Sequence, residues 1–141
     1  QELGIQIYSF PEYLYEVSKK KQRVVIAGSH GKTTITSMVM HVLKESGFDF
    51  DYMVGAKVKG FDTSVKITEN APIIVLEGDE YLASPINRES KFMFYKPNVA
   101  LITGVAWDHI NVFPDYDDYV EQFKKFAYSM DECGFLTCYS Q

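Results

Sequence analysis

Residues 23–34 read RVVIAGSHGKTT, and this stretch decides the fold. A β-branched run over residues 23–27 ends at Gly28, as expected of a strand that enters a turn. Apolar residues then recur at helical spacing up to Gly47, namely Ile35, Met38, Val39, Val42 and Leu43. The pattern predicts a strand, a glycine-containing turn and an amphipathic helix, in that order.

The turn has the composition of a phosphate-binding loop. It consists of Gly28, Ser29, His30, Gly31, Lys32, Thr33 and Thr34. Small residues let backbone N–H groups point at phosphate oxygens, and the following helix adds its positive N-terminal end. Lys32 is expected to reach the β- and γ-phosphates, while the Thr33 hydroxyl ligates magnesium. ATP and Mg²⁺ are therefore the ligands that this loop predicts.

The loop departs from the common pattern at its first glycine. The spacing Gly-x4-Gly-Lys-Thr would place that glycine where this chain has Ile26, and the available glycine is Gly28. The loop is therefore a shortened variant. The alternative interpretation is that Gly28 and Gly31 only form a tight turn and that Lys32 is solvated.

Acidic residues follow the next strongly apolar strand. After residues 73–76 the chain reads Glu77-Gly78-Asp79-Glu80. Open α/β sheets bind ligands at the carboxyl ends of their strands, so a metal ligand is expected here, and Glu77 is the candidate. For Asp79 and Glu80, a solvated acidic strand end is an equally good interpretation.

A second candidate metal ligand follows the strand expected over residues 99–103. There the chain reads Trp107-Asp108-His109, and a neutral imidazole at this edge of the sheet can bind a metal ion. Taken alone, a single histidine favours a structural role. His41 lies inside the expected helix and is interpreted as structural.

The remaining pattern alternates strands with helices. Strands are expected over residues 52–54, 73–77, 99–103 and 135–139, with weaker signals at 65–67 and 91–95. A helix capped by Asp115 should bury one face, made of Tyr116, Tyr119, Val120, Phe123, Phe126 and Ala127. Parallel neighbours need crossovers between them, so the fold class is α/β, a mostly parallel phosphate-loop sheet flanked by helices.

The N-terminal part predicts a linker and an entry helix over residues 1–21, ahead of one domain over residues 22–141. Ser9 and Glu12 have the spacing of a capping box, and the helix should span residues 10–19. The cluster Lys19, Lys20 and Lys21 is expected to close this helix as a solvated group.

Composition excludes several classes of protein. With 141 residues, 46% of them hydrophobic, the chain is long enough for one core and too short for two full domains. The formal net charge of -5 argues against a nucleic-acid-binding surface. Cys133 and Cys138 show neither zinc spacing nor a disulfide framework, and no apolar run is long enough to span a bilayer. A soluble, cytoplasmic chain excised from a longer protein is expected.

The run GSHGKTT resembles the variant phosphate loop of the muramyl (Mur) ligase family, which includes the folylpolyglutamate synthases. A histidine at the position of His30 is typical of its members that act on UDP-N-acetylmuramate. The resemblance implies that Glu77 and His109 bind magnesium ions and that Lys32, Glu77 and His109 are catalytic. The sequence departs from many members at Gly104, where they carry asparagine, and at Asn111, where an acidic residue is common.

The family's activity implies an ATP-dependent, ADP-forming ligase that joins the UDP-N-acetylmuramate carboxylate to an amino acid or short cell-wall peptide through an acyl phosphate. Family members carry further N-terminal UDP-binding and C-terminal domains. The segment from Asp79 to Pro97, with Arg88 and Lys91, resembles the murein tripeptide ligases more than the alanine-adding ligases.

Other readings remain open. A small-molecule kinase should show an arginine-rich lid, whereas this chain has only Arg23 and Arg88. A non-catalytic nucleotide-binding module is compatible with Gly104 and with the length of the chain. Folylpolyglutamate synthase is disfavoured by His30.

Overall fold

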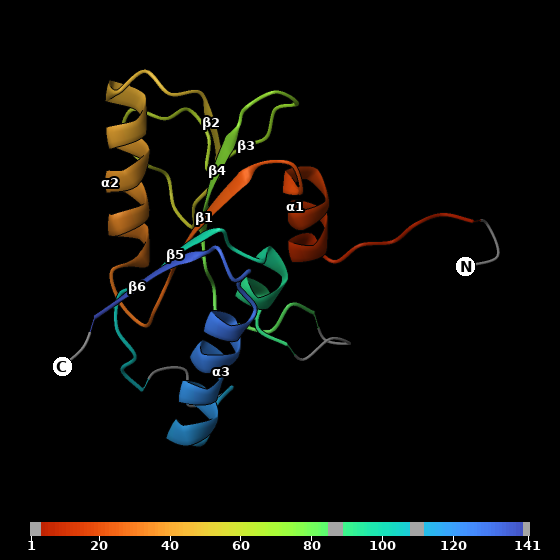
Figure 1. Ribbon diagram of the computed structural model, residues 1–141, viewed down its shortest axis with the longest axis vertical. Helices are drawn as coiled ribbons and strands as arrows, with labels where there is room; N and C mark the ends of the chain where they lie inside the picture. The colour runs from red at the N-terminus through yellow and green to blue at the C-terminus, as the bar shows by residue number, and fades with distance from the viewer. Residues whose placement is uncertain (1–3, 85–88, 108–111, 140–141) are drawn as a thin grey trace.

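The computed structural model describes residues 4–84, 89–107 and 112–139. Its centre is a six-stranded sheet in the order β3-β2-β4-β1-β5-β6 (Figure 1). All neighbouring strands pair in parallel except β2 and β3, which are antiparallel. The predicted α/β class is therefore confirmed, with β1 and β4 at the middle of the sheet.

The helices and strands follow the predicted order except at residues 91–95. Along the chain they are α1 Phe10–Ser18, β1 Gln22–Ala27, α2 Lys32–Glu45, β2 Phe50–Met53, β3 Val65–Lys66, β4 Ile73–Glu77, the 3-10 helix η1 Lys91–Tyr95, β5 Val99–Ile102, α3 Tyr116–Tyr128 and β6 Phe135–Cys138. No helix within the described ranges is long and apolar enough to cross a membrane.

Two hydrophobic cores lie on opposite faces of the sheet. On one face α2 packs through Met40 on Ile26 and Val75. On the other face α1, η1 and α3 together cover the sheet, with Leu14, Phe92 and Tyr119 in one cluster. Figure 1 shows α2 alone on its side of the sheet and α1 on the opposite side. The inner strands β1, β2 and β4 are mostly buried between these layers, whereas the edge strands β3 and β6 are largely exposed.

The prediction of a strand at residues 91–95 is wrong, because this segment forms η1. Phe92 and Tyr95 are both fully buried in the same core. Residues three apart share a face of a 3-10 helix, whereas in a strand an odd spacing would point them to opposite faces.

Two predicted helix faces also need correction. Met38 and Val42 are 62% and 64% exposed, while Thr36 and Met40 face the sheet. Ile35, Val39 and Leu43 pack on this core as predicted, so the buried stripe is shifted toward Thr36 and Met40. In α3, Tyr116 is 44% exposed because it lies at the first turn, beyond the buried Tyr119 and Phe123.

The lysine cluster after α1 is not uniformly solvated. Lys19 and Lys20 are exposed, but Lys21 is buried and forms an ion pair with Asp51 of β2. Lys21 directly precedes β1, and its ammonium group also donates to the carbonyl of Thr68. The Thr68 hydroxyl in turn donates to Asp51. At the other end of α1, the backbone N–H of Ser9 donates to Glu12 (2.6 Å), as the capping-box spacing predicts.

Candidate nucleotide and metal site

The phosphate loop leaves the carboxyl end of β1, at the centre of the sheet, and enters α2. Gly28 has φ of 123°, and a Cβ there would lie 2.2 Å from Thr103 Oγ1. Thr103 in turn donates to the carbonyl of His30 (2.6 Å). A side chain at position 28 would therefore push the loop away from the end of β5, so a glycine is required.

The N-terminus of α2 is open toward the same edge. Its N-cap is Gly31, with φ of 77°, and the helix begins at Lys32. The first N–H groups of a helix have no partner within the helix, so those of Lys32, Thr33 and Thr34 form a positive end suited to an anion.

Lys32 lies over the loop, where its ammonium group contacts both backbone and carboxylate. Nζ donates to the carbonyl of Gly28 (2.7 Å) and lies 2.8 Å from Glu80 Oε2. Only 15% of the Lys32 side chain is exposed, so the interpretation of a solvated lysine on a plain turn is wrong. Glu80 is 1% exposed, so it is not a solvated acidic strand end either.

Thr33 and Glu77, the two predicted magnesium ligands on described residues, are in direct contact. The Thr33 hydroxyl donates to Glu77 Oε1 (2.9 Å), and the backbone N–H of Gly55 donates to Oε2 (2.9 Å). Nothing in the sequence indicated this role for Gly55. A Cβ at Gly55 would lie 3.0 Å from Glu77 Oε1, so the glycine allows β2 to end close to this carboxylate.

The oxygen pair of Thr33 and Glu77 has the chemistry of a magnesium site. A hydroxyl and a carboxylate are hard ligands, and Mg²⁺ in nucleotide sites takes few protein ligands besides phosphate and water. No cluster of three or more His, Cys, Asp or Glu that could hold a metal is found within residues 4–84, 89–107 and 112–139. The remaining predicted ligand, His109, lies outside the described residues, as do Asp108, Asn111 and Arg88.

Asp79 belongs to a separate ion pair. Its carboxylate lies 2.6 Å from Lys91 Nζ and also accepts from the backbone N–H of Tyr81 (2.9 Å).

Nearby, burial raises the pKa of the Tyr95 phenol, and the negative charges of Asp79 and Glu77 raise it further. The Tyr95 hydroxyl therefore stays protonated at neutral pH.

Ser29 is held by residues far away in the sequence. Its hydroxyl lies 2.9 Å from that of Tyr119 in α3 and accepts from the backbone N–H of Ala106 (2.9 Å). Ser29 and Tyr119 are both buried. This support for the loop was missed because it joins residues 90 positions apart.

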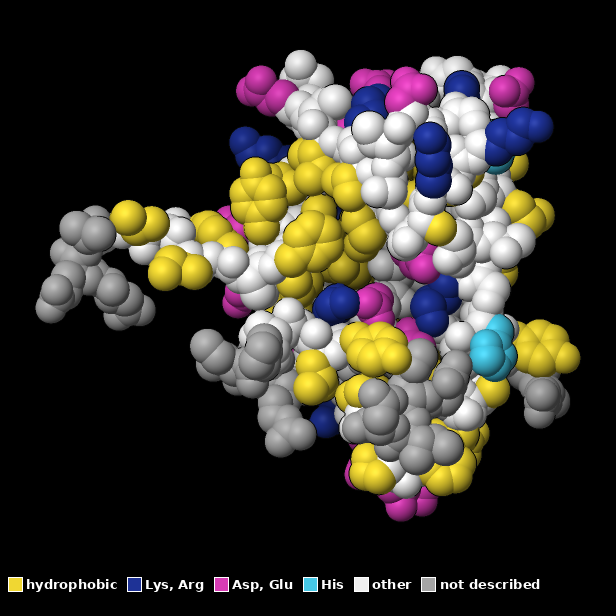
Figure 2. Space-filling model, turned by 180° about the vertical axis from the view of Figure 1, so that it is seen from behind, with side chains coloured by type: hydrophobic (Ala, Val, Ile, Leu, Met, Phe, Trp, Pro, Cys, Tyr) yellow, Lys and Arg dark blue, Asp and Glu magenta, His cyan; other side chains and the backbone are white. Residues whose placement is uncertain are grey.

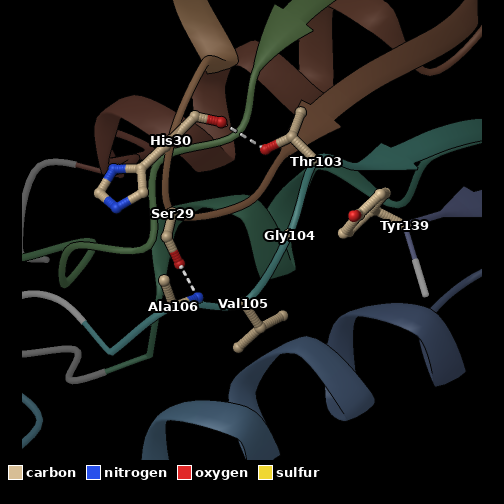
Figure 3. A pocket seen from close by; sticks show the side chains of 7 residues that line it. All are labelled: Ser29, His30, Thr103, Gly104, Val105, Ala106 and Tyr139. Carbon is tan, nitrogen blue, oxygen red and sulfur yellow. Dashed lines mark hydrogen bonds between the residues drawn. The ribbon is translucent and has the colours of Figure 1, made fainter. Parts of the chain in front are cut away.

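A cavity of about 340 Å³ opens beside the loop. It is lined by Ser29, His30, Thr103, Gly104, Val105, Ala106 and Tyr139 (Figure 3). Figure 3 shows the loop residues on one side and residues 103–106 on the other, joined by the bonds from Thr103 to His30 and from Ala106 to Ser29. Gly104, with φ of 145°, lies between these two bonds.

A family model described as the Mur ligase middle domain matches residues 26–140. Among curated relatives, the UDP-N-acetylmuramate–L-alanine ligase of Desulfitobacterium hafniense (strain Y51) is 33% identical over 95% of this chain. That of Borreliella burgdorferi is 32% identical over 96% of it. The chain spans 28% of the length of each of these relatives.

Solved structures of two UDP-N-acetylmuramate ligases also resemble this chain. The UDP-N-acetylmuramate:L-alanyl-gamma-D-glutamyl-meso-diaminopimelate ligase from Neisseria meningitides superposes with a TM-score of 0.89 at 29% identity, covering 99% of this chain and 46% of that one. The UDP-N-acetylmuramate-alanine ligase from Thermotoga maritima has a TM-score of 0.72 at 24% identity, over 94% of this chain and 28% of that one, and shows the shared fold.

Proposed function

Since the chain belongs to the Mur ligase family, we propose that it binds ATP and Mg²⁺ as the nucleotide-binding centre of an ATP-dependent carboxylate–amine ligase. The observation that carries this proposal is the contact between Thr33 and Glu77 beside Lys32, at the N-terminus of α2. The three groups occupy the edge of the sheet where parallel strands end. His109 is proposed as a further metal ligand and catalytic residue.

The proposed reaction has two steps. In the first, an oxygen of the substrate carboxylate attacks the γ-phosphorus of ATP, the bond to the β,γ-bridging oxygen breaks, and ADP leaves with the electron pair. In the second, the amine nitrogen attacks the acyl carbon, the carbon–oxygen bond to phosphate breaks, phosphate leaves, and the nitrogen loses a proton.

The residues of the chain serve these steps by position and charge. Lys32, already within reach of the loop carbonyl and of Glu80, would stabilise negative charge on the transferring phosphoryl group. The N–H groups at the start of α2 would hold phosphate oxygens, and the cavity beside His30 would take the rest of the nucleotide. Magnesium, held by Thr33 and Glu77, supplies charge neutralisation when bound.

We propose UDP-N-acetylmuramate as the carboxylate substrate and the tripeptide L-alanyl-γ-D-glutamyl-meso-diaminopimelate as the amine. The tripeptide is favoured by the likeness to the Neisseria ligase, with a TM-score of 0.89. L-Alanine is the second candidate amine, favoured by the 33% identity to the Desulfitobacterium ligase. In this proposal residues 22–141 form the central domain and residues 1–21 lead into it. Other domains of the full-length protein bind the UDP-sugar and the amine. The enzyme works in the cytoplasm.

Two rival functions can be distinguished from the ligase. A kinase lid needs arginines near the phosphates, but the Arg23 guanidinium is committed to the backbone carbonyls of Ser18, Lys19, Lys21 and Lys96. A non-catalytic nucleotide-binding module would release no ADP with either amine, and replacing Glu77 in it would lower little besides its affinity for the metal.

The test is ADP release by the full-length protein that contains this chain, with ATP and UDP-N-acetylmuramate. One reaction contains the tripeptide, a second contains L-alanine, and both are repeated with Glu77→Gln. Release that depends on the tripeptide and is lost in Glu77→Gln supports the proposal. Release that depends on L-alanine selects the second candidate, and silence with both amines overturns ligase function.

A further inference from the structure

The segment that follows β4 brings a carboxylate back to the phosphate loop. The N–H of Gly78 donates to the carbonyl of Ile26 (2.7 Å), and a Cβ at Gly78 would lie 3.1 Å from side-chain carbons of β1. A side chain at this position would press on β1, so the glycine lets the chain pass close to that strand. Glu80, two residues later, is thereby placed beside Lys32.

The backbone on either side of Glu80 is fixed by η1. The carbonyl of Asp79 accepts from the N–H of Phe92 (3.2 Å), and the carbonyl of Tyr81 accepts from the N–H of Lys91 (2.8 Å). Phe92 is itself fully buried in the core. Glu80 therefore lies on a segment that both β1 and η1 hold in place.

The Glu80 carboxylate and the phosphate loop together hold the Lys32 ammonium group. Nζ lies 3.1 Å from Oε1 and 2.8 Å from Oε2 of Glu80, and it donates to the carbonyl of Gly28 (2.7 Å). An ammonium group has three hydrogens to donate. Its third contact, with the carbonyl of Ser29, is long (3.5 Å), so it is the one that a phosphate oxygen would replace.

Lys32 and Glu80 both line a cavity of about 380 Å³, together with Glu77, Asp79 and Lys91. The space-filling view shows acidic and basic side chains gathered next to a hydrophobic patch on this side of the molecule (Figure 2). The Lys32 side chain is 15% exposed and that of Glu80 only 1%. The ammonium group, and not the Glu80 carboxylate, is therefore presented to a ligand.

Stability alone does not account for a carboxylate at position 80. Removing a charged pair from water costs about as much as the attraction returns, and apolar residues of similar size often stabilise a fold equally well. A fixed carboxylate does provide position, since the long stem of a lysine is flexible without an anchor. Position matters for transfer of a phosphoryl group, because a displacement of about 1 Å can cost roughly 100-fold in rate.

We propose that Glu80 is a positioning residue for the phosphoryl-transfer step, because it fixes the ammonium group of Lys32 over the phosphate loop. The proposal rests on the ligase function proposed above. Glu80 itself touches no substrate, and its negative charge opposes binding of the triphosphate. Replacing Glu80 should therefore slow the transfer step without weakening nucleotide binding.

The experiment compares the wild type with Glu80→Gln in the full-length protein that contains this chain. ADP formation is followed in a single turnover, with enzyme in excess over MgATP and with UDP-N-acetylmuramate and the amine that supports ADP release by the wild type. The rate constant should fall about 10- to 100-fold, because a neutral amide holds the ammonium group less firmly. The Kd for MgATP, measured by calorimetry, should stay the same or fall, because a negative charge near the triphosphate has been removed.

Glu80→Asp is the second variant. It keeps the charge but shortens the side chain by one methylene, so the carboxylate no longer holds Lys32 at the same place. Its rate constant should fall as well, with the Kd for MgATP within twofold of the wild type. A carboxylate that only keeps the fold intact would leave this variant at the wild-type rate.

Asp51→Asn is the matched control, because it makes the same change from acid to amide in another buried pair, that of Lys21 and Asp51. Below its melting temperature, which should be lowered, this variant should keep the wild-type rate constant and Kd. Wild-type rate constants in both Glu80 variants, or a loss of MgATP affinity as large as the loss of rate, overturn the role of Glu80 alone. A wild type that forms no ADP overturns the ligase function, and this inference with it.

Discussion

Two buried lysine–carboxylate pairs lie at opposite ends of β1, and they differ in what surrounds them. Lys21, just before the strand, pairs with Asp51, and their side chains are 5% and 0% exposed. Lys32, just after the phosphate loop, pairs with Glu80, and their side chains are 15% and 1% exposed. By burial and chemistry alone the two pairs are alike.

Their other contacts separate them. Asp51 also accepts hydrogen bonds from the N–H and hydroxyl of Thr68, so the first pair is enclosed by protein groups. Lys32 lies at a helix N-terminus, against the carbonyl of Gly28, and lines a cavity with Glu77. A buried ion pair therefore indicates a ligand site only where it lies beside both the free N–H groups of a helix N-terminus and a cavity.

The largest effect expected is on stability, from Lys21→Met. Removing one partner leaves the Asp51 charge buried, which typically costs about 3–5 kcal/mol. Denaturant unfolding of the chain measures this loss. Lys124→Met is the control, because its pair with Glu121 is exposed and should contribute less than about 1 kcal/mol. Equal losses in the two variants would show that the Lys21 pair is not structural.

The second prediction separates the two pairs by function. The double variant Lys32→Met/Glu80→Gln removes both charges of this pair and leaves neither partner buried as an unpaired charge, so the fold should persist. Nucleotide affinity should fall about 10- to 100-fold, the range for losing a hydrogen bond to a charged group. Binding of ATP is measured by calorimetry. Wild-type affinity in this double variant would mean that the Lys32 pair is as structural as the Lys21 pair.

A smaller effect is expected from Tyr119→Phe, which removes the group that holds Ser29 at 2.9 Å. One such hydrogen bond contributes about 1 kcal/mol, so ATP affinity should fall roughly fivefold. Tyr128→Phe, at a residue 87% exposed, should change nothing. If both variants bind ATP equally well, the loop does not depend on α3.

The smallest effect belongs to the carboxylate of Glu12, a half-buried residue. Hydrogen bonds from Ser9 lower its pKa from the ordinary 4.5, so its charged form stabilises the fold. This contribution is present above pH 4.5 and is lost as the pH falls through the lowered pKa. Glu12→Gln should therefore lower the melting temperature slightly at pH 7 and not in stronger acid. A difference that persists in acid would contradict this origin.

The sequence was most informative where structure depends on neighbours along the chain. The strand, glycine turn and helix at residues 22–45 follow from β-branched residues, two glycines and helical periodicity. The contact between Thr33 and Glu77 was also foreseeable, because β1 and β4 end at the same edge. By contrast, the apolar and aromatic run of η1 is compatible with either a strand or a helix, and its burial decided the outcome.

Contacts between distant segments could not be foreseen. Nothing near Ser29 in the sequence indicates Tyr119, and nothing near Lys21 indicates Asp51. Gly55 likewise gains its contact with Glu77 only when β2 is folded beside the end of β4. His109 stays a prediction, because it lies outside the described residues.

The central claim is that Thr33 and Glu77 hold magnesium for a nucleotide bound at the loop. Calorimetric titration of the chain with ATP, in MgCl₂ and separately in EDTA, tests it most directly, with wild type and Glu77→Gln compared. The account predicts that magnesium strengthens ATP binding to the wild type and has little effect on Glu77→Gln, with both proteins folded. The same affinity in all four titrations, or no binding by the wild type, would contradict it.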